Sequence, residues 1–278
     1  MRLLLGKPVA EKILDDVKKK IAESGVTPGL AVILVGNDKP SQAYVFIKEK
    51  KAAEIGIHFE KFVLPKEVSE SDIVELIRKL NNRQEIHGII VQMPLPLGID
   101  ADKVVATINP NKDADGFHAD TIGKFLGGDK ERIPVFPMAI MEMVKASGIS
   151  LHGKSAVVVA NSHRFGDLMK KPLFDEGTLV DVIFCDELES QSHRGALVNA
   201  QIMITACGRG GLIRRNMVPK AALIIDGGII EISNKIFGDV DLESFEGTDT
   251  AISPVPGGVG PVTVACLLRR VTELAFDK

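Results

Sequence analysis

Residues 155–166, SAVVVA followed by NSHRFG, contain the clearest structural signal in this 278-residue chain. The first six residues are small or β-branched, which predicts a buried strand over 155–160. A polar turn follows at once, and apolar spacing then predicts a helix through Phe174. Further strands are predicted at 179–185, 201–205 and 222–225. This series of strand, turn, helix and strand indicates a Rossmann-like region with a parallel sheet.

The N-terminal half alternates in the same way. Helices are predicted at 9–24, 41–55 and 69–81, strands at 30–35, 58–63 and 87–92, and a short helix that ends within 104–108. Ser41 is expected to cap the second helix and Gly56 to end it. Glycine and proline interrupt the pattern over 116–135, which marks a domain transition. Helices at 138–147 and 260–276 follow, and the last is expected to pack on the first domain.

The composition excludes several classes of protein. A net charge of −3 provides no basic field for nucleic acid, and no apolar run approaches the roughly 18 residues of a membrane span. The first residues lack the pattern of a signal peptide. Cys185, Cys207 and Cys266 are odd in number and lack metal-ligand spacing, so we expect free thiols and no metal site. Free thiols fit a reducing compartment, and the cytoplasm is the expected location.

Four polar residues are candidates for catalysis. Tyr44 and Lys48 are four residues apart in a predicted helix, which places them on one face, about 5–6 Å apart at Cβ. Gln92 ends a predicted strand, where α/β sheets bind ligands. Asp115 lies in the turn NPNKDADGF, next to Asp113. Together they suggest a proton-handling site, although Lys48 can also be an exposed helix lysine and either aspartate can simply shape the turn.

Two further segments indicate ligand sites. The turn after residues 155–160 contains Gly166 alone, so the usual G-x-G-x-x-G signature is absent and an ordinary βα turn stays an alternative. Asp186 follows the next predicted strand, where a carboxylate can bind a ribose diol and would repel a ribose phosphate; it can also be a plain loop residue. The string SPVPGGVGP at 253–261 combines fixed and permissive backbone, which suits either a ligand pocket or a stiff connector.

Six strings, in this order, resemble the bifunctional methylenetetrahydrofolate dehydrogenase/methenyltetrahydrofolate cyclohydrolase family: VGNDKPSQAYVFIKEK, GIIVQMPLPLGID, INPNKDADGF, IIDGG, GDVD and SPVPGGVGPVT. The resemblance implies an N-terminal three-layer α/β domain and a C-terminal Rossmann-like nucleotide-binding domain, with a cleft between them. Residues 1–119 plus 254–278 would bind folate, and residues 120–253 the dinucleotide. The family is typically a homodimer that acts on tetrahydrofolate derivatives in one-carbon metabolism, which serves purine and amino-acid biosynthesis.

The resemblance also assigns roles to residues. Lys48 matches the family's catalytic lysine and Tyr44 its active-site tyrosine, with Gln92 holding Lys48 and Asp115 binding the pterin. The implied substrate-binding residues are Ser41, Tyr44, Asp115, Pro256, Gly257 and Gly258. The implied cofactor-binding residues are Ala160, Asn161, Ser162, Arg164, Asp186 and Ile229. No metal is implied.

The nucleotide segment departs from the family pattern. Ala160, Asn161 and Ser162 stand where glycine, arginine and serine are usual, and Asn161 has no charge for the ribose phosphate of NADP. The segment Cys185-Asp186-Glu187 replaces a turn with histidine and serine, and PVFP at 134–137 replaces PCTP. NADP is the family's cofactor, and NAD is the alternative given Asp186 and Asn161. A cyclohydrolase with a degenerate nucleotide site and a non-catalytic folate-binding protein remain alternative functions.

Overall fold

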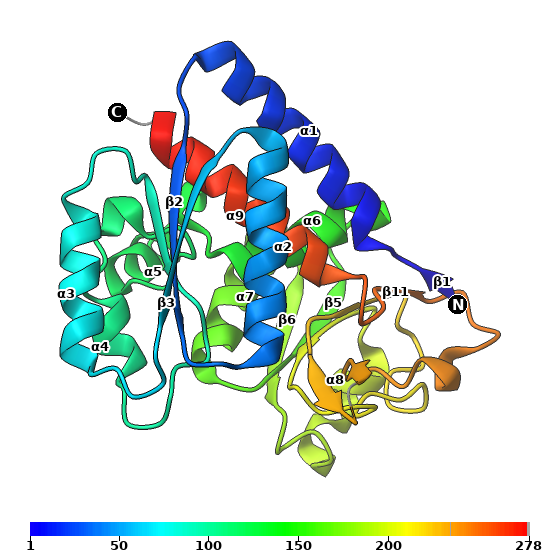
Figure 1. Cartoon of the computed structure of the whole chain (residues 1–278). Helices are drawn as coiled ribbons and strands as arrows, with labels where there is room; N and C mark the ends of the chain where they lie inside the picture. The colour runs from blue at the N-terminus through cyan, green and yellow to red at the C-terminus, as the bar shows by residue number, and fades with distance from the viewer. Residues whose placement is uncertain (234, 277–278) are drawn as a thin grey trace. The chain divides into compact units, whose positions relative to one another are not determined.

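The computed structural model describes residues 1–233 and 235–276, which form two compact α/β units (Figure 1). One unit contains residues 1–9 and 137–263, and the other contains residues 10–136 and 264–278. The expected two-domain α/β architecture is confirmed. The functional boundaries given above, 1–119 with 254–278 and 120–253, remain a prediction.

The unit of residues 10–136 and 264–278 is built on a three-stranded parallel sheet in the order β3-β2-β4. Its strands are β2 (Gly29–Val35), β3 (His58–Leu64) and β4 (Gly88–Val91), and β2 and β3 lie side by side in Figure 1. Every residue of β2 is buried, as expected for a central strand covered on both faces. Ile33 and Ile89 form a core with Ile73 and Ile77 of the helix α3 (Glu70–Asn81).

Local capping chemistry explains where the helices of this unit begin and end. Helix α2 (Lys39–Ile55) ends at Gly56, which is left-handed at φ 88° as predicted. The predicted cap at Ser41 is wrong: the carboxylate of Asp38 caps the helix by accepting from the Ser41 amide at 2.9 Å. A carboxylate satisfies amides at a helix start and complements the helix dipole. The helix expected to end within 104–108 is α4 (Ala101–Val105), with Asp100 as its cap.

The remaining helices complete the fold. Helix α3 starts with a reciprocal capping box formed by Ser69 and Asp72. The others are α1 (Gly6–Ser24), α5 (Ala119–Leu126), α6 (Val135–Ser147), α7 (His163–Asp175), α8 (Arg194–Asn199) and α9 (Val259–Phe276). The N-terminal helix begins three residues earlier than its apolar spacing indicated.

The second unit contains a six-stranded parallel sheet in the order β1-β11-β8-β7-β5-β6. Its strands are β1 (Arg2–Leu3), β5 (Ser155–Ala160), β6 (Leu179–Phe184), β7 (Ile202–Ala206), β8 (Leu223–Asp226) and β11 (Ala251–Ile252). A separate antiparallel hairpin joins β9 (Ile230–Ile232) to β10 (Lys235–Phe237). The Rossmann-like prediction is confirmed, because β5, α7 and β6 form a parallel unit with β7 on the other side of β5.

The expectation of three free thiols is wrong. Cys185 and Cys207 form a disulfide, and the buried Cys266 is not part of one. Cys185 follows β6 and Cys207 follows β7, so the parallel sheet brings both to the same edge although they are 22 residues apart. Within the described residues, no helix is long and apolar enough to cross a membrane, and no group of His, Cys, Asp or Glu side chains is arranged to hold a metal ion.

Candidate active site

Lys48 is a buried lysine on helix α2, with 5% of its surface exposed. Its Nζ donates a hydrogen bond to Oε1 of Gln92 at 2.9 Å and lies 4.8 Å from the centroid of the Tyr44 ring. The four-residue spacing thus brings phenol and ammonium together as predicted, in cation–π contact. The alternative of a solvent-exposed helix lysine is wrong.

Gln92 is held in place by the backbone at the end of β4. Its amide N–H donates to the Ile33 carbonyl at 2.8 Å and continues the ladder of the sheet. The side-chain Nε2 donates to the Met93 carbonyl at 2.7 Å, which leaves Oε1 directed at Lys48. Ser41, one helical turn before Tyr44, reaches the same carbonyl through its Oγ at 3.5 Å. The carboxyl edge of the sheet therefore joins Ser41, Lys48 and Gln92 in one polar group.

The two aspartates of the turn after α4 have different tasks. Asp113 is buried, and its carboxylate accepts hydrogen bonds from the amides of Gly116, Phe117 and His118 at 2.8–3.2 Å. These bonds shape the turn. Asp115 is partly buried, and its charge acts on Lys48 instead. Of the two candidates, Asp113 is the turn residue and Asp115 is available for chemistry.

Burial shifts the pKa values of Lys48 and Asp115 in the directions that favour their uncharged forms. It lowers the pKa of Lys48, and the negative charge of Asp115 opposes that shift. Burial likewise raises the pKa of Asp115; Lys48 pulls that pKa down and Asp113 pushes it up. A lowered pKa makes the amine give up its proton more readily, which is the direction required of a general base.

The predicted cofactor residues lie at the carboxyl edge of the six-stranded sheet. Ala160 is the last residue of β5. Asn161, in the turn, and Arg164, in the first turn of α7, are both exposed. Ser162 caps α7, because its hydroxyl oxygen accepts a hydrogen bond from the Phe165 amide at 3.3 Å. Asp186 follows β6. Ile229, which is 62% exposed, follows β8. Since all these strands are parallel, their carboxyl ends share one edge, where α/β sheets bind nucleotides.

Three residues at this edge were missed by sequence reasoning. Arg209, after β7, forms an ion pair with Asp186.

The other two are buried acids. Asp226 ends β8 and accepts hydrogen bonds from the backbone amides of Gly228, Asp239 and Val240. Asp239 is fully buried and accepts from the Thr205 hydroxyl and from the amides of Cys207 and Arg209 at 2.6–2.8 Å. The sequence signal for two of them was present: Asp226 in IIDGG and Asp239 in GDVD are each a carboxylate beside apolar residues.

Burial raises the pKa of Asp226 to about 7, while the hydrogen bond from the Val240 amide acts in the opposite direction. The two carboxylates are enclosed so tightly that glycine is required beside them. A Cβ on Gly228 would lie 2.1 Å from the Asp239 carboxyl, and a Cβ on Gly238 would lie 2.1 Å from that of Asp226. These acids therefore organise the loops after β7 and β8.

The glycines of the PVPGG string have a structural reason of their own. The Gly6 amide donates to the Gly257 carbonyl at 2.8 Å, and a Cβ on Gly6 would lie 1.8 Å from the Gly258 carbonyl oxygen. A Cβ on Gly258 would in turn lie 2.6 Å from the Pro254 carbonyl oxygen. This close backbone approach fixes the loop against the start of α1. Contact of Pro256, Gly257 and Gly258 with a ligand stays a prediction.

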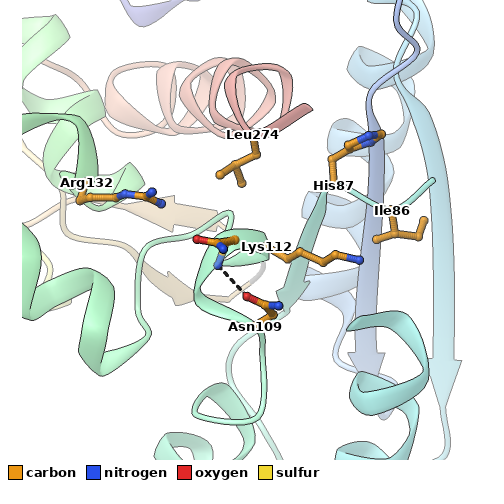
Figure 2. A pocket seen from close by; sticks show the side chains of 7 residues that line it. Ile86, His87, Asn109, Lys112, Arg132 and Leu274 are labelled. Atoms are coloured by element: carbon orange, nitrogen blue, oxygen red, sulfur yellow. Dashed lines mark hydrogen bonds between the residues drawn. The ribbon is translucent and has the colours of Figure 1, made fainter. Parts of the chain in front are cut away.

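A cavity of about 280 Å³ lies at the other end of β4 from Gln92 (Figure 2). Figure 2 shows Lys112 and His87 on one side and Arg132 on the other. Lys112 is engaged with the carbonyls of Leu80 and Arg83, and His87 Nδ1 accepts from the Gly29 amide. None of the predicted site residues lines this cavity. The lining residues are Ile86, His87, Asn109, Asn111, Lys112, Arg132 and Leu274.

The fold and these sites define a two-domain α/β protein with a buried amine in one unit and a Rossmann-like sheet in the other. Two family models match it: the tetrahydrofolate dehydrogenase/cyclohydrolase catalytic domain over residues 4–115, and the NAD(P)-binding domain of the same family over residues 134–278. The chain belongs to the tetrahydrofolate dehydrogenase/cyclohydrolase family.

Individual relatives agree over the full length. The chain is 39% identical to the bifunctional protein FolD of Campylobacter hominis, covering 100% of this chain and 98% of that protein. Among solved structures, the bifunctional FolD enzyme of Campylobacter jejuni matches at a TM-score of 0.92 and 35% identity, covering 100% and 99%. The Trypanosoma brucei methylenetetrahydrofolate dehydrogenase-cyclohydrolase, complexed with NADP and an inhibitor, matches at 0.91 and 30%, covering 99% and 97%.

Proposed function

We propose that this protein oxidises methylene-tetrahydrofolate to methenyl-tetrahydrofolate and then hydrolyses that product to formyl-tetrahydrofolate. The observation that carries the proposal is the buried Lys48 amine held by Gln92 beside Tyr44. A nicotinamide cofactor, when bound, would accept the hydride of the first reaction. Family membership supports both activities, because the relatives described above are named as bifunctional dehydrogenase/cyclohydrolase enzymes.

Lys48 would perform the proton transfers of the second reaction. Water adds to the carbon of the methenyl cation and loses a proton to the neutral amine. The resulting adduct opens when one carbon–nitrogen bond breaks. The lysine returns its proton to the departing nitrogen, and the hydroxyl loses its own proton to water as it becomes the formyl oxygen. Gln92 would keep the amine in place for both transfers. The lowered pKa of Lys48 supports this role, since the amine must be neutral to begin.

The remaining residues of the site would hold the ligands. Asp115 would accept hydrogen bonds from the amino and ring N–H groups of the pterin. Ser41, Tyr44 and the loop residues Pro256, Gly257 and Gly258 would contact the folate. Ala160, Asn161, Ser162, Arg164, Asp186 and Ile229 would contact the dinucleotide. We assign folate binding to residues 1–119 with 254–278 and dinucleotide binding to residues 120–253.

NADP is the proposed cofactor, with NAD as the alternative. The Trypanosoma brucei relative, which was solved with NADP, supports the first. The uncharged Asn161 and the exposed carboxylate of Asp186 favour the second.

A homodimer is also proposed. The cytoplasm stays the proposed location, although the disulfide between Cys185 and Cys207 removes the free-thiol argument for it. The hairpin β9–β10 exposes Ile232, Ile236 and Phe237, each by 43–50%, which supports a protein–protein contact through the nucleotide unit. Light scattering after gel filtration should give twice the monomer mass. Ile236→Lys should lower that mass by half, and a wild-type monomer would contradict the proposal.

The decisive experiment compares Lys48→Met with Lys50→Met, which removes an exposed lysine from the same helix. Hydrolysis of methenyl-tetrahydrofolate is followed by absorbance without any nucleotide. Lys48→Met should lose on the order of 10²- to 10⁴-fold in rate, whereas Lys50→Met should retain wild-type turnover. Normal hydrolysis by Lys48→Met would refute the role, and circular dichroism checks that both variants fold.

The altered nucleotide turn keeps a second candidate function open, namely a cyclohydrolase without dehydrogenase activity. Reduction of NADP and of NAD with methylene-tetrahydrofolate separates the two. Hydrolysis with reduction of neither nucleotide would select the cyclohydrolase. Inert behaviour in both assays would select a folate-binding protein without turnover.

A further inference from the structure

The ion pair between Asp186 and Arg209 spans the carboxyl edge of the six-stranded sheet. We propose that Arg209 is a specificity-determining residue. It pairs with Asp186 when NAD is bound and turns to the ribose 2′-phosphate when NADP is bound, so that one site accepts both cofactors. This inference rests on the proposed dehydrogenase function and goes beyond it by naming the group that binds the phosphate.

The positions of the two residues fit the ribose end of a dinucleotide. Asp186 follows β6, about 20 residues after the turn that starts α7, where Rossmann-like folds place the acid that binds the ribose diol. Arg209 follows β7, and β6 and β7 are the two strands that flank β5. The two side chains thus reach over the end of β5 from opposite sides.

The backbone on both sides of the pair is firmly held. The Arg209 amide donates to Asp239 Oδ1 at 2.8 Å, and the Cys207 amide donates to Oδ2 of the same carboxylate at 2.6 Å. The disulfide joins Cys207 to Cys185, which directly precedes Asp186. Arg209 therefore projects from a fixed base, and only its side chain has to move.

The charged ends of the pair, in contrast, are accessible. The Asp186 side chain is 83% exposed and that of Arg209 is 48% exposed. Besides Asp186, the guanidinium donates to the Cys185 carbonyl at a long 3.4 Å. An exposed ion pair of this kind contributes little to stability, so a ligand opens it easily. A freed guanidinium matches the oxygens of a phosphate with two parallel hydrogen bonds.

Charge complementarity explains how both cofactors are accepted. With a 2′-hydroxyl on the ribose, Asp186 accepts a hydrogen bond from it while Arg209 balances the carboxylate. With a 2′-phosphate, the Asp186 carboxylate alone would repel the ligand. Arg209 supplies the positive charge that Asn161 lacks. The carboxylate of the neighbouring Glu187 lies 3.6 Å from Nε2 of His193.

The test measures dissociation constants of NADP and NAD by calorimetry for the wild type, Arg209→Gln and Asp186→Asn. Arg209→Gln should weaken NADP by on the order of tenfold and NAD by less than about threefold. Asp186→Asn should shift the preference the other way, toward NADP. Lys220→Gln is the matched control: it removes a charge that bonds Asn199 at the amino edge of the same sheet and should change neither constant.

Equal losses for both nucleotides in Arg209→Gln, or no loss for either, would overturn the proposal. So would a wild type that binds only one of the two. Hydrolysis of methenyl-tetrahydrofolate without nucleotide is measured in parallel for the wild type and Lys220→Gln, and should be the same in both. A wild type that binds both nucleotides but hydrolyses nothing would contradict the proposed function and leave the assignment of Arg209 intact.

Discussion

Lys48 and Asp226 are both buried ionisable side chains, one in each unit, and burial shifts the pKa of each toward its neutral form. Their partners differ. Lys48 faces groups of other side chains: an amide oxygen, an aromatic ring and the charge of Asp115. The Asp226 carboxylate accepts hydrogen bonds from three backbone amides of the loops around it.

This difference in partners distinguishes a group that can take part in a reaction from one that maintains the fold. A group held by side chains can gain or lose a proton without disturbing the course of the chain. A carboxylate held by three amides is part of the backbone's own hydrogen bonding, and its loss leaves buried donors unsatisfied. A shifted pKa alone therefore does not identify a catalytic group, and the identity of the partners is the better guide.

Breaking the enclosure around Asp226 and Asp239 with a single substitution should have a large effect on stability. Gly228→Ala places a Cβ 2.1 Å from the Asp239 carboxyl, so the loop must move and unfolding should become easier by about 3 kcal/mol. Thermal and urea denaturation measure this loss.

The control is Gly195→Ala in helix α8, where no atom beyond the adjoining residues and the helix's own backbone lies within 4 Å of the new Cβ. Alanine there should stabilise the helix by about 0.5–1 kcal/mol. Equal stability of the two variants would contradict the close packing around the buried acids.

The second prediction concerns the dependence of stability on pH. The pKa of Asp226 is raised to about 7, so between about pH 4 and pH 7 the folded state keeps a proton that the unfolded state has lost. This carboxyl therefore makes the free energy of unfolding fall as pH rises, by at most about 1.4 kcal/mol per pH unit.

The free energy of unfolding of Asp226→Asn, measured over the same pH range, should lack this contribution. Because every other titrating group is shared, the difference between the two curves isolates Asp226. Parallel curves would show that the carboxyl is ionised throughout. Its ¹³C chemical shift in the native protein provides a direct check and should titrate near pH 7.

Gln92→Glu should sharpen the assignment of Lys48. The substitution puts a carboxylate where an amide oxygen now lies 2.9 Å from Nζ, which favours the ammonium and raises the pKa of Lys48. The rising limb of the cyclohydrolase pH–rate profile should move to higher pH by about one unit, a tenfold loss of rate on that limb. An unmoved limb would mean that another group takes the proton.

Asp115→Asn should move the same limb in the opposite direction, by a smaller amount. Asp115 opposes the dominant effect of burial on the pKa of Lys48, so removing its charge lowers that pKa further. Profiles of kcat at saturating folate separate this shift from weaker binding of the pterin, which should appear in KM. A limb that moves toward higher pH would contradict the electrostatic coupling.

Much of the fold was accessible from sequence because its signals are local. The apolar run 155–160, the capping box at Ser69 and the left-handed Gly56 each depend on a few neighbouring residues. The grouping of Lys48 with Gln92 also followed, since parallel strands and their helices meet at one edge of a sheet.

The features that the sequence did not predict are of two kinds. Some depend on residues far apart in the chain, and one depends on a choice between two neighbouring residues that can both cap a helix. Asp186 and Arg209 are 23 residues apart, and nothing near either one indicates the other. The disulfide escaped for the same reason, because only the strand order brings Cys185 to Cys207. At the start of α2, Asp38 and Ser41 are both good caps, and backbone geometry decided between them.

The division of the chain has a consequence for its synthesis. The unit whose bulk is made first, residues 10–136, also includes residues 264–278, and Val271 would lie within 2.9 Å of a Cβ on Gly88 at the start of β4. The other unit includes the first nine residues, whose strand β1 pairs with β11. On the ribosome, the unit whose bulk emerges first is thus completed only after residues 137–263 of the other unit have been made, when helix α9 becomes available to its core.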